Sequence, residues 1–268
     1  MPHAPKVDSH FHLFDRSAPF VDKPRHTPDY DFSAEDLLAQ LDKHGVDKGV
    51  IAAASLYGQY HDLAIRAVRQ HKRLRGTILG DPSLNLYDLE RMADDGIVGM
   101  RLVWISLSDD CLPDIGSTEW RRILRRIRDL DWHVHLHVGP GRLPSILPTV
   151  MESGAKTVLD HFAYPDPKQG LNCPTFQAAL RAIDNGRTWI KLSAGYRMGG
   201  REACMPYAQK LLEVAGPERL LWGSDAPFAS FEGKVTYQET LDDLVAWVPD
   251  EKARRIIGDE TPMKLYFG

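Results

Sequence analysis

The chain has 268 residues, of which 43% are hydrophobic, and a formal net charge of −4 at neutral pH. This length suits one large domain with a full core, and the mild acidic balance favours neither nucleic acid nor an anionic membrane as a partner. The sequence shows no apolar run of the roughly 18 residues that a membrane span needs and no charged-then-apolar leader. The widely spaced Cys111, Cys173 and Cys204 match no metal or redox motif. We expect a cytoplasmic protein, monomeric or homo-oligomeric.

Short segments rich in Val, Ile and Leu recur along the chain, and most are followed by a stretch of helical periodicity. Dense apolar strands of this kind are typical of parallel sheets that are covered by helices. The predicted strands are residues 7–14, 49–55, 75–80, 98–103, 133–138, 157–162, 188–193 and 220–225.

Several of the intervening helices have recognisable ends. Ser33 and Asp36 form a capping-box pattern, and Gly45 lies where that helix should end. Further helices are predicted over residues 86–93, 120–130 and 174–186. A short one near the C-terminus starts at Pro249 and Asp250 and closes at Gly258.

Strands that alternate with helices indicate a parallel sheet with right-handed crossovers, either a closed barrel or an open doubly wound sheet. No Gly-x-Gly-x-x-Gly or P-loop turn follows a strand, so the nucleotide-binding open sheets lose support. The chain length is close to the roughly 250 residues of a typical barrel. With no linker or break in composition, residues 1–268 are predicted to form a single α/β domain, a (β/α)8 TIM-type barrel.

Ionisable side chains collect where these strands end, which in a barrel is the face that carries the active site. His10 and His12 point the same way on an extended strand, because alternate residues share a face. A buried charge or imidazole costs several kcal/mol unless it is paired or bound to a metal, so its recurrence on successive strands indicates a site. The remaining members are Arg101, His135, His137, His161, Arg197 and Asp225.

Four nearby residues have less certain roles in the pattern. His133 begins its strand and is expected at the bottom of the barrel or on the surface. His135 is either a site residue or a core histidine with its hydrogen bonds satisfied. Asp160 should face opposite to His161 and bond backbone or a helix. Lys191 is either an interior ion-pair partner or a residue that supports the site.

Five motifs stand in order along the chain: VDSHFH at residues 7–12, GMR at 99–101, LDHF at 159–162, KLSAGYR at 191–197 and LWGSDAP at 221–227. Together with residues 260–266 they resemble the amidohydrolase superfamily, in the branch of 2-pyrone-4,6-dicarboxylate lactonase and the related sugar-lactone and muconolactone hydrolases. The resemblance implies an amidohydrolase-like barrel enzyme that opens a small carboxylated lactone, an EC 3.1.1-type reaction of aromatic or sugar-acid catabolism.

The resemblance also implies roles for individual residues. It places His10, His12, His161 and Asp225 around the reacting carbonyl. Asp225 is then the candidate base that takes a proton from water and returns it to the leaving oxygen. The three histidines would polarise the carbonyl and stabilise the developing oxyanion.

Arginines are expected to hold the substrate. By the resemblance, Arg101 and Arg197 dock carboxylates, which fixes the ring relative to the water. His26, Tyr57 and Tyr164 lie in loops after strands, where each either bonds the substrate or only packs its loop. The pyrone lactonase pattern has a second arginine shortly after strand four, and residues 102–107 here (LVWISL) lack it.

The sequence leaves open whether a metal takes part. His10, His12, His137 and Asp225 would make three imidazoles and a carboxylate, a set that suits one zinc or other divalent ion with a water position free. The bridging lysine or glutamate of binuclear members is not evident, so a two-metal site is not expected. A metal-free site is the alternative.

Two other functions share this barrel. One is a single-zinc decarboxylase or hydratase of an unsaturated acid, which would use nearly the same residues. The other is a non-catalytic binding barrel, against which the ionisable groups at the strand ends argue. The irregular segment 15–32, with three prolines, follows the first strand as functional covers often do.

Overall fold

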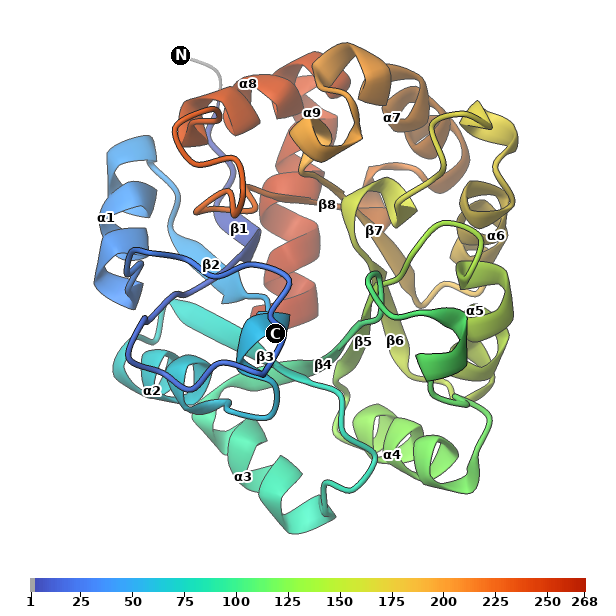
Figure 1. Ribbon diagram of the computed structural model, residues 1–268. Helices are drawn as coiled ribbons and strands as arrows, with labels where there is room; N and C mark the ends of the chain where they lie inside the picture. The colour runs from blue at the N-terminus through green and yellow to red at the C-terminus, as the bar shows by residue number, and fades with distance from the viewer. Residues whose placement is uncertain (1–2) are drawn as a thin grey trace.

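A computed structural model describes residues 3–268. Its strands form one parallel sheet in the order β1-β2-β3-β4-β5-β6-β7-β8, and Ala226 after β8 pairs with Phe11 of β1 to close the ring. The predicted (β/α)8 barrel is therefore confirmed (Figure 1). The strands are β1 (Val7–Phe11), β2 (Lys48–Ile51), β3 (Leu74–Leu79), β4 (Ile97–Val103), β5 (His133–His137), β6 (Lys156–Leu159), β7 (Thr188–Ser193) and β8 (Leu220–Gly223).

Helices surround the strands in Figure 1, and none within residues 3–268 is long and apolar enough to cross a bilayer. The capping box of Ser33 and Asp36 opens the first helix, and Gly45 ends it in a left-handed conformation, as predicted. The helices are α1 (Ala34–His44), α2 (Asp62–Gln70), α3 (Leu86–Asp95), α4 (Thr118–Asp129), α5 (Leu143–Glu152), α6 (Pro174–Ile183), α7 (Arg201–Ala215), α8 (Tyr237–Trp247) and α9 (Glu251–Arg255).

The prediction that the last helix closes at Gly258 is wrong. After α9 the chain continues through wider π-type turns at Ile256–Glu260 and Met263–Phe267. Gly258 does not end the helix. It allows the backbone to approach Pro5 closely, because a Cβ at position 258 would lie 2.5 Å from the Cβ of Pro5. The sequence could not separate these two uses of glycine.

The C-terminal segment closes the bottom of the barrel. Tyr266 is buried in a cluster with Val7, Val50, Val158 and Leu221, which lie in β1, β2, β6 and β8. Met263, Leu265 and Phe267 pack against the same cluster. The opposite end of the barrel, where the strands finish, is not covered by this segment.

The segment between β1 and α1 lies across that open end, where Figure 1 shows it as a dark blue trace in front of the strands. Phe14 and Phe32 pair in antiparallel fashion at its base, with N–H···O distances of 3.0 and 2.8 Å. Farther along, the Val21 N–H donates to the Leu56 carbonyl at 2.9 Å. The irregular segment is thus held at several points over the mouth of the barrel.

The seam between β8 and β1 leaves no room for a side chain at Gly223. A Cβ there would lie 2.5 Å from the Cβ of His10 and 2.8 Å from its backbone nitrogen. We expect Gly223→Ala to lower the free energy of unfolding by about 1–3 kcal/mol, because strand and histidine must both shift. Urea unfolding measures the change. Gly116→Ala, whose Cβ would meet only the Asp114 side chain within 3.5 Å, is the control; equal stability of both variants would contradict the prediction.

Candidate active site

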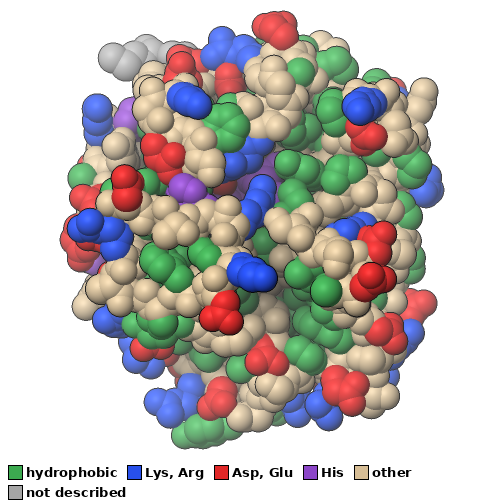
Figure 2. All heavy atoms as spheres, in the orientation of Figure 1, with side chains coloured by type: hydrophobic (Ala, Val, Ile, Leu, Met, Phe, Trp, Pro, Cys, Tyr) green, Lys and Arg blue, Asp and Glu red, His purple; other side chains and the backbone are tan. Residues whose placement is uncertain are grey.

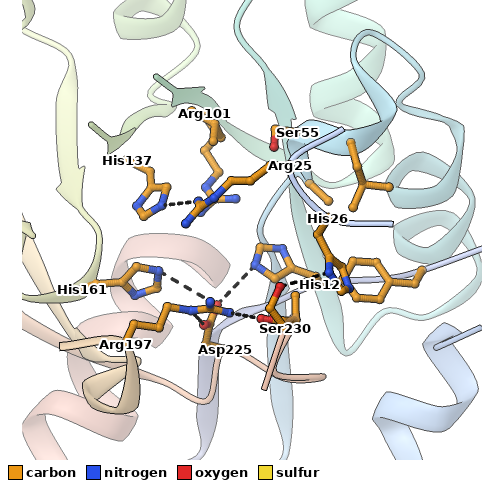
Figure 3. A pocket seen from close by; sticks show the side chains of 15 residues that line it. His12, Arg25, His26, Ser55, Arg101, His137, His161, Arg197, Asp225 and Ser230 are labelled. Atoms are coloured by element: carbon orange, nitrogen blue, oxygen red, sulfur yellow. Dashed lines mark hydrogen bonds and ion pairs between the residues drawn. The ribbon is translucent and has the colours of Figure 1, made fainter. Parts of the chain in front are cut away.

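A cavity of about 600 Å³ opens at the mouth of the barrel. Figure 2 shows histidine and basic side chains gathered in a hollow on this face, and Figure 3 shows how they converge. Residues from β1, β4, β5, β6, β7 and β8, or from the turns just after them, meet there as the sequence predicts. Those that line the cavity are His12, His26, Arg101, His137, His161, Arg197 and Asp225.

Asp225 lies at the centre of the site and is fully buried. Its Oδ2 accepts hydrogen bonds from the Tyr196 hydroxyl at 2.6 Å and from Arg197 Nε at 2.8 Å. Burial opposes ionisation, but Arg197 and His161 beside the carboxyl hold its pKa well below the usual range. Asp225 is therefore a carboxylate at neutral pH.

The other oxygen of Asp225 faces two imidazole nitrogens. Oδ1 lies 3.3 Å from His12 Nε2 and 3.4 Å from His10 Nε2, and it accepts no hydrogen bond within residues 3–268. His12 Nδ1 lies 2.8 Å from the Ala52 carbonyl, which only accepts, so Nδ1 carries a proton. In the tautomer that has this proton alone, Nε2 carries a lone pair. His10 Nδ1 lies 3.0 Å from a carboxylate oxygen of Asp160, which orients that ring in the same way.

Two lone pairs and a carboxylate oxygen thus point at one another, an arrangement that a cation between them would satisfy. The candidate ligand atoms of His10, His12 and Asp225 lie within 4.8 Å of one another, as do those of His10, Asp160 and His161. Two imidazoles and one carboxylate suit a divalent transition metal. The residues therefore fit one such ion.

His137 belongs to neither of these groups in the described chain. Its Nε2 lies 3.3 Å from Nη1 of Arg25 and accepts from it, since a guanidinium only donates. Burial lowers the pKa of His137 well below its ordinary value, which keeps the ring neutral. The structure therefore brings three of the four predicted ligands together and gives His137 a different neighbour.

The prediction for Asp160 is wrong. Within residues 3–268 the Asp160 side chain bonds neither backbone nor a helix. It is buried in the barrel, where Arg101 donates to its Oδ2 from Nε at 3.3 Å and Nη2 at 2.8 Å. His135 Nε2 contacts its other oxygen. β6 ends at Leu159 and His161 has a positive φ of 47°, so the alternation of an extended strand does not reach this pair.

Lys191 lies in the same buried layer. Its Nζ is 3.2 Å from His10 Nδ1, 3.1 Å from His135 Nε2 and 3.7 Å from Asp160 Oδ1. Burial lowers the pKa of Lys191 to about 7. Lys191 and His135 therefore support His10 from beneath and do not reach the cavity. His133, as expected, is at the bottom, where Nδ1 bonds the Val98 carbonyl.

The predicted substrate-binding residues fall into two sets. Arg101, Arg197 and His26 line the cavity. Tyr57 and Tyr164 do not: the Tyr57 hydroxyl accepts from the Asp15 N–H at 2.7 Å and donates to its carbonyl at 3.1 Å. The Tyr164 ring packs against the His137 ring in a T-shaped arrangement. Both pack loops.

Three further polar residues line the cavity and are not among the predicted ones. Arg25 comes from the segment over the mouth, Ser55 from the turn after β2, and Ser230 from the turn after β8. Ser230 Oγ is 3.1 Å from Nδ1 of His26. The sequence predicts the proline-rich segment as a cover, but no motif in it indicates which side chain turns inward.

Comparison with known proteins shows to which family the chain belongs. A family model described as amidohydrolase matches residues 7–268. The chain belongs to the amidohydrolase family. This amidohydrolase is 28% identical to the 4-sulfomuconolactone hydrolase of Rhizobium radiobacter, over 97% of this chain and 89% of that protein.

Solved structures give the same result. A probable 2-pyrone-4,6-dicarboxylic acid hydrolase from Acinetobacter baumannii, solved with citric acid bound, is 27% identical with a TM-score of 0.93, covering 99% of this amidohydrolase and all of that chain. A Pseudomonas putida structure described as the same kind of hydrolase is 30% identical with a TM-score of 0.90, covering 99% and 98%. The predicted family is confirmed, and these names agree with the predicted lactone-opening hydrolase.

The buried histidines predict that the free energy of unfolding decreases in acid. Burial lowers the pKa of His133 to about 3 and of His161 to about 4, and moves those of His10, His135 and His137 well below the ordinary value. Below about pH 6.5 the unfolded chain protonates these rings while the folded protein does not, so each contributes up to about 1.4 kcal/mol of lost stability per pH unit.

Urea unfolding with a chelator at pH 7 and pH 5 tests this, and we expect a clearly lower midpoint at pH 5. Burial raises the pKa of Asp8 to about 6, so this carboxyl binds a proton in the folded protein as the pH falls, which stabilises the fold. This one group opposes the loss of stability that the five histidines cause. An unchanged or higher midpoint at pH 5 would show that the rings are protonated in the folded state.

Proposed function

We propose that this amidohydrolase hydrolyses a small carboxylated lactone, with Asp225 as the base that activates water. The observation that carries the proposal is the Oδ1 atom of Asp225. It is held ionised at the edge of the cavity, within 3.4 Å of His10 and His12, while Arg197 and Tyr196 occupy only the other oxygen. The lactone-hydrolase relatives support the same reaction.

The substrate carboxylate docks first, on the guanidinium of Arg197. Nε of Arg197 donates to Asp225 and Nη2 to the Ala229 carbonyl at 3.0 Å, which leaves Nη1 for a ligand. A carboxylate placed there shares the positive charge that holds the Asp225 pKa low, so docking makes Asp225 a stronger base. Arg101 lines the side of the cavity where His137 lies, fixed by Asp160 and by the Ala53 carbonyl.

Water then adds to the ring carbonyl. Asp225 Oδ1 takes one proton from the water as the water oxygen bonds to the carbonyl carbon. His161 is placed to donate to the oxyanion. Its Nδ1 pairs with Ser193 Oγ at 2.8 Å, and its Nε2 lies 4.0 Å from Asp225 Oδ1. When the ring carbon–oxygen bond breaks, Asp225 returns the proton to the leaving oxygen, and one water has been added overall.

His10, His12 and Asp225 are the residues that would hold one divalent ion in this site. When bound, such an ion supplies Lewis-acid polarisation and lowers the pKa of water. Two facing lone pairs and the unpartnered Oδ1 support this assignment, because without a cation or a proton among them they repel one another. Arg25 already occupies the Nε2 atom of His137.

Replacing the base tests the reaction. We expect Asp225→Asn to lower kcat by roughly 10²–10⁴-fold on any carboxylated lactone that the wild type opens, because the amide accepts no proton from water. Acid release from sugar-acid, muconolactone and pyrone lactones is the measurement. Asp243→Asn, outside the cavity on α8, is the matched control. Undiminished turnover by Asp225→Asn would refute the mechanism, and carbon dioxide release without lactone opening would favour a decarboxylase.

Elemental analysis tests the metal assignment. We expect about one divalent ion per chain in the wild type and in His137→Ala, and under about 0.1 in His12→Ala. Added zinc should raise the melting temperature of the first two proteins only, since binding stabilises the folded state. A fully active wild type with under about 0.1 metal per chain would show that the site works without metal.

A further inference from the structure

Asp8 is a fully buried carboxyl group to which the proposed reaction gives no role. It is not among the described residues that line the cavity. Its Oδ1 accepts hydrogen bonds from the backbone N–H groups of His10 at 3.1 Å and Ser224 at 2.9 Å. Its Oδ2 accepts from the hydroxyls of Ser224 at 2.6 Å and Tyr237 at 3.0 Å. In the protein interior, such a satisfied network restricts every group that belongs to it.

The groups that Asp8 binds adjoin the reacting side chains. His10 is itself one of the site histidines, and Ser224 immediately precedes Asp225 in the chain. On the other side of Asp225, the Ala226 N–H donates to the Ser224 hydroxyl at 3.0 Å. Asp8 therefore holds the N–H groups on both sides of Asp225, one directly and one through the Ser224 side chain.

The backbone of Asp225 needs this support. Its φ is 65°, a left-handed conformation that is uncommon for a residue with a Cβ atom. An aspartate reaches that conformation most easily when its side chain bonds nearby backbone. Here Oδ2 binds Tyr196 and Arg197, and Oδ1 accepts no hydrogen bond within residues 3–268. A conformation of this kind persists only when the surrounding structure imposes it.

We propose that Asp8 is a positioning residue that acts on Asp225 through Ser224. It holds Asp225 in the left-handed conformation that directs the carboxylate toward His10 and His12. The consequence for turnover rests on the proposed function, in which Asp225 is the base. The restraint on the backbone around Asp225 does not depend on the reaction and can be measured separately.

Hydrogen exchange followed by mass spectrometry tests the restraint without a substrate. In Asp8→Asn the side-chain oxygen still accepts from the two N–H groups, but the NH2 group cannot accept from the Ser224 hydroxyl. We expect the peptide that covers residues 220–229 to exchange about fivefold faster in Asp8→Asn and in Ser224→Ala, the effect of one lost hydrogen bond. Peptides from β4 and β5 should keep their wild-type rates, which distinguishes local opening from general unfolding.

Tyr237→Phe is the matched control. The Tyr237 hydroxyl bonds Asp8 but neither of the N–H groups that flank Asp225. Its loss should lower the urea midpoint and leave the exchange of residues 220–229, relative to β4 and β5, as in the wild type. An equal local acceleration in Tyr237→Phe, or none in Asp8→Asn, would overturn the proposal.

Kinetics connect the restraint to the reaction. On a lactone that the wild type opens, Asp8→Asn and Ser224→Ala should each lower kcat about 10- to 100-fold, because a misplacement of about 1 Å has an effect of this size. KM should change less than about threefold, since the substrate docks on Arg197, which the Ala229 carbonyl also holds. Tyr237→Phe should retain the wild-type kcat.

The variant that carries both Asp8→Asn and Ser224→Ala tests whether Asp8 acts through Ser224. Its kcat should be no lower than that of the more damaged single variant, because both changes break one connection, whereas independent losses multiply. Multiplied losses, or a wild-type kcat in Asp8→Asn, would overturn the proposal. Failure of the wild type to open any pyrone, muconolactone or sugar-acid lactone would instead overturn the proposed function, and hydrogen exchange would still decide the role of Asp8.

Discussion

The contact between Asp225 and the two histidines of β1 is the constraint on which the rest of the site depends. It exists because β8 returns to β1 and closes the ring, with Asp225 N–H donating to the His10 carbonyl at 2.8 Å. That backbone bond places the Asp225 carboxylate against His10 and His12, although more than 200 positions of the chain separate Asp225 from these histidines. Gly223 permits the approach, since any larger residue would meet His10.

Beneath this contact lies a second, buried layer of charged groups. Asp160 joins Arg101, His135 and His10, and Lys191 closes the group from β7. In a low-dielectric interior such groups are stable only when each has a partner, so they fix one another's orientation. The layer therefore keeps the His10 ring aimed at Asp225 and the Arg101 side chain against the cavity wall.

The cavity above is shaped in part by loops. A rigid barrel supplies the reacting groups, while the segment after β1 contributes Arg25 and His26 from outside the strands. This division is usual for barrels, where strand ends carry chemistry and loops carry specificity.

The barrel could be predicted from the amino-acid sequence, because apolar strands and helical periodicity are local signals. The same signals predict that His10, His12, His161, Arg197 and Asp225 stand at strand ends. The orientation of Asp160, the packing of Tyr57 in its loop, the contact of His137 with Arg25 and the entry of Arg25 into the cavity could not be predicted and are known from the fold. These depend on positive-φ turns after the strands and on contacts between segments far apart in the chain, which no local pattern encodes.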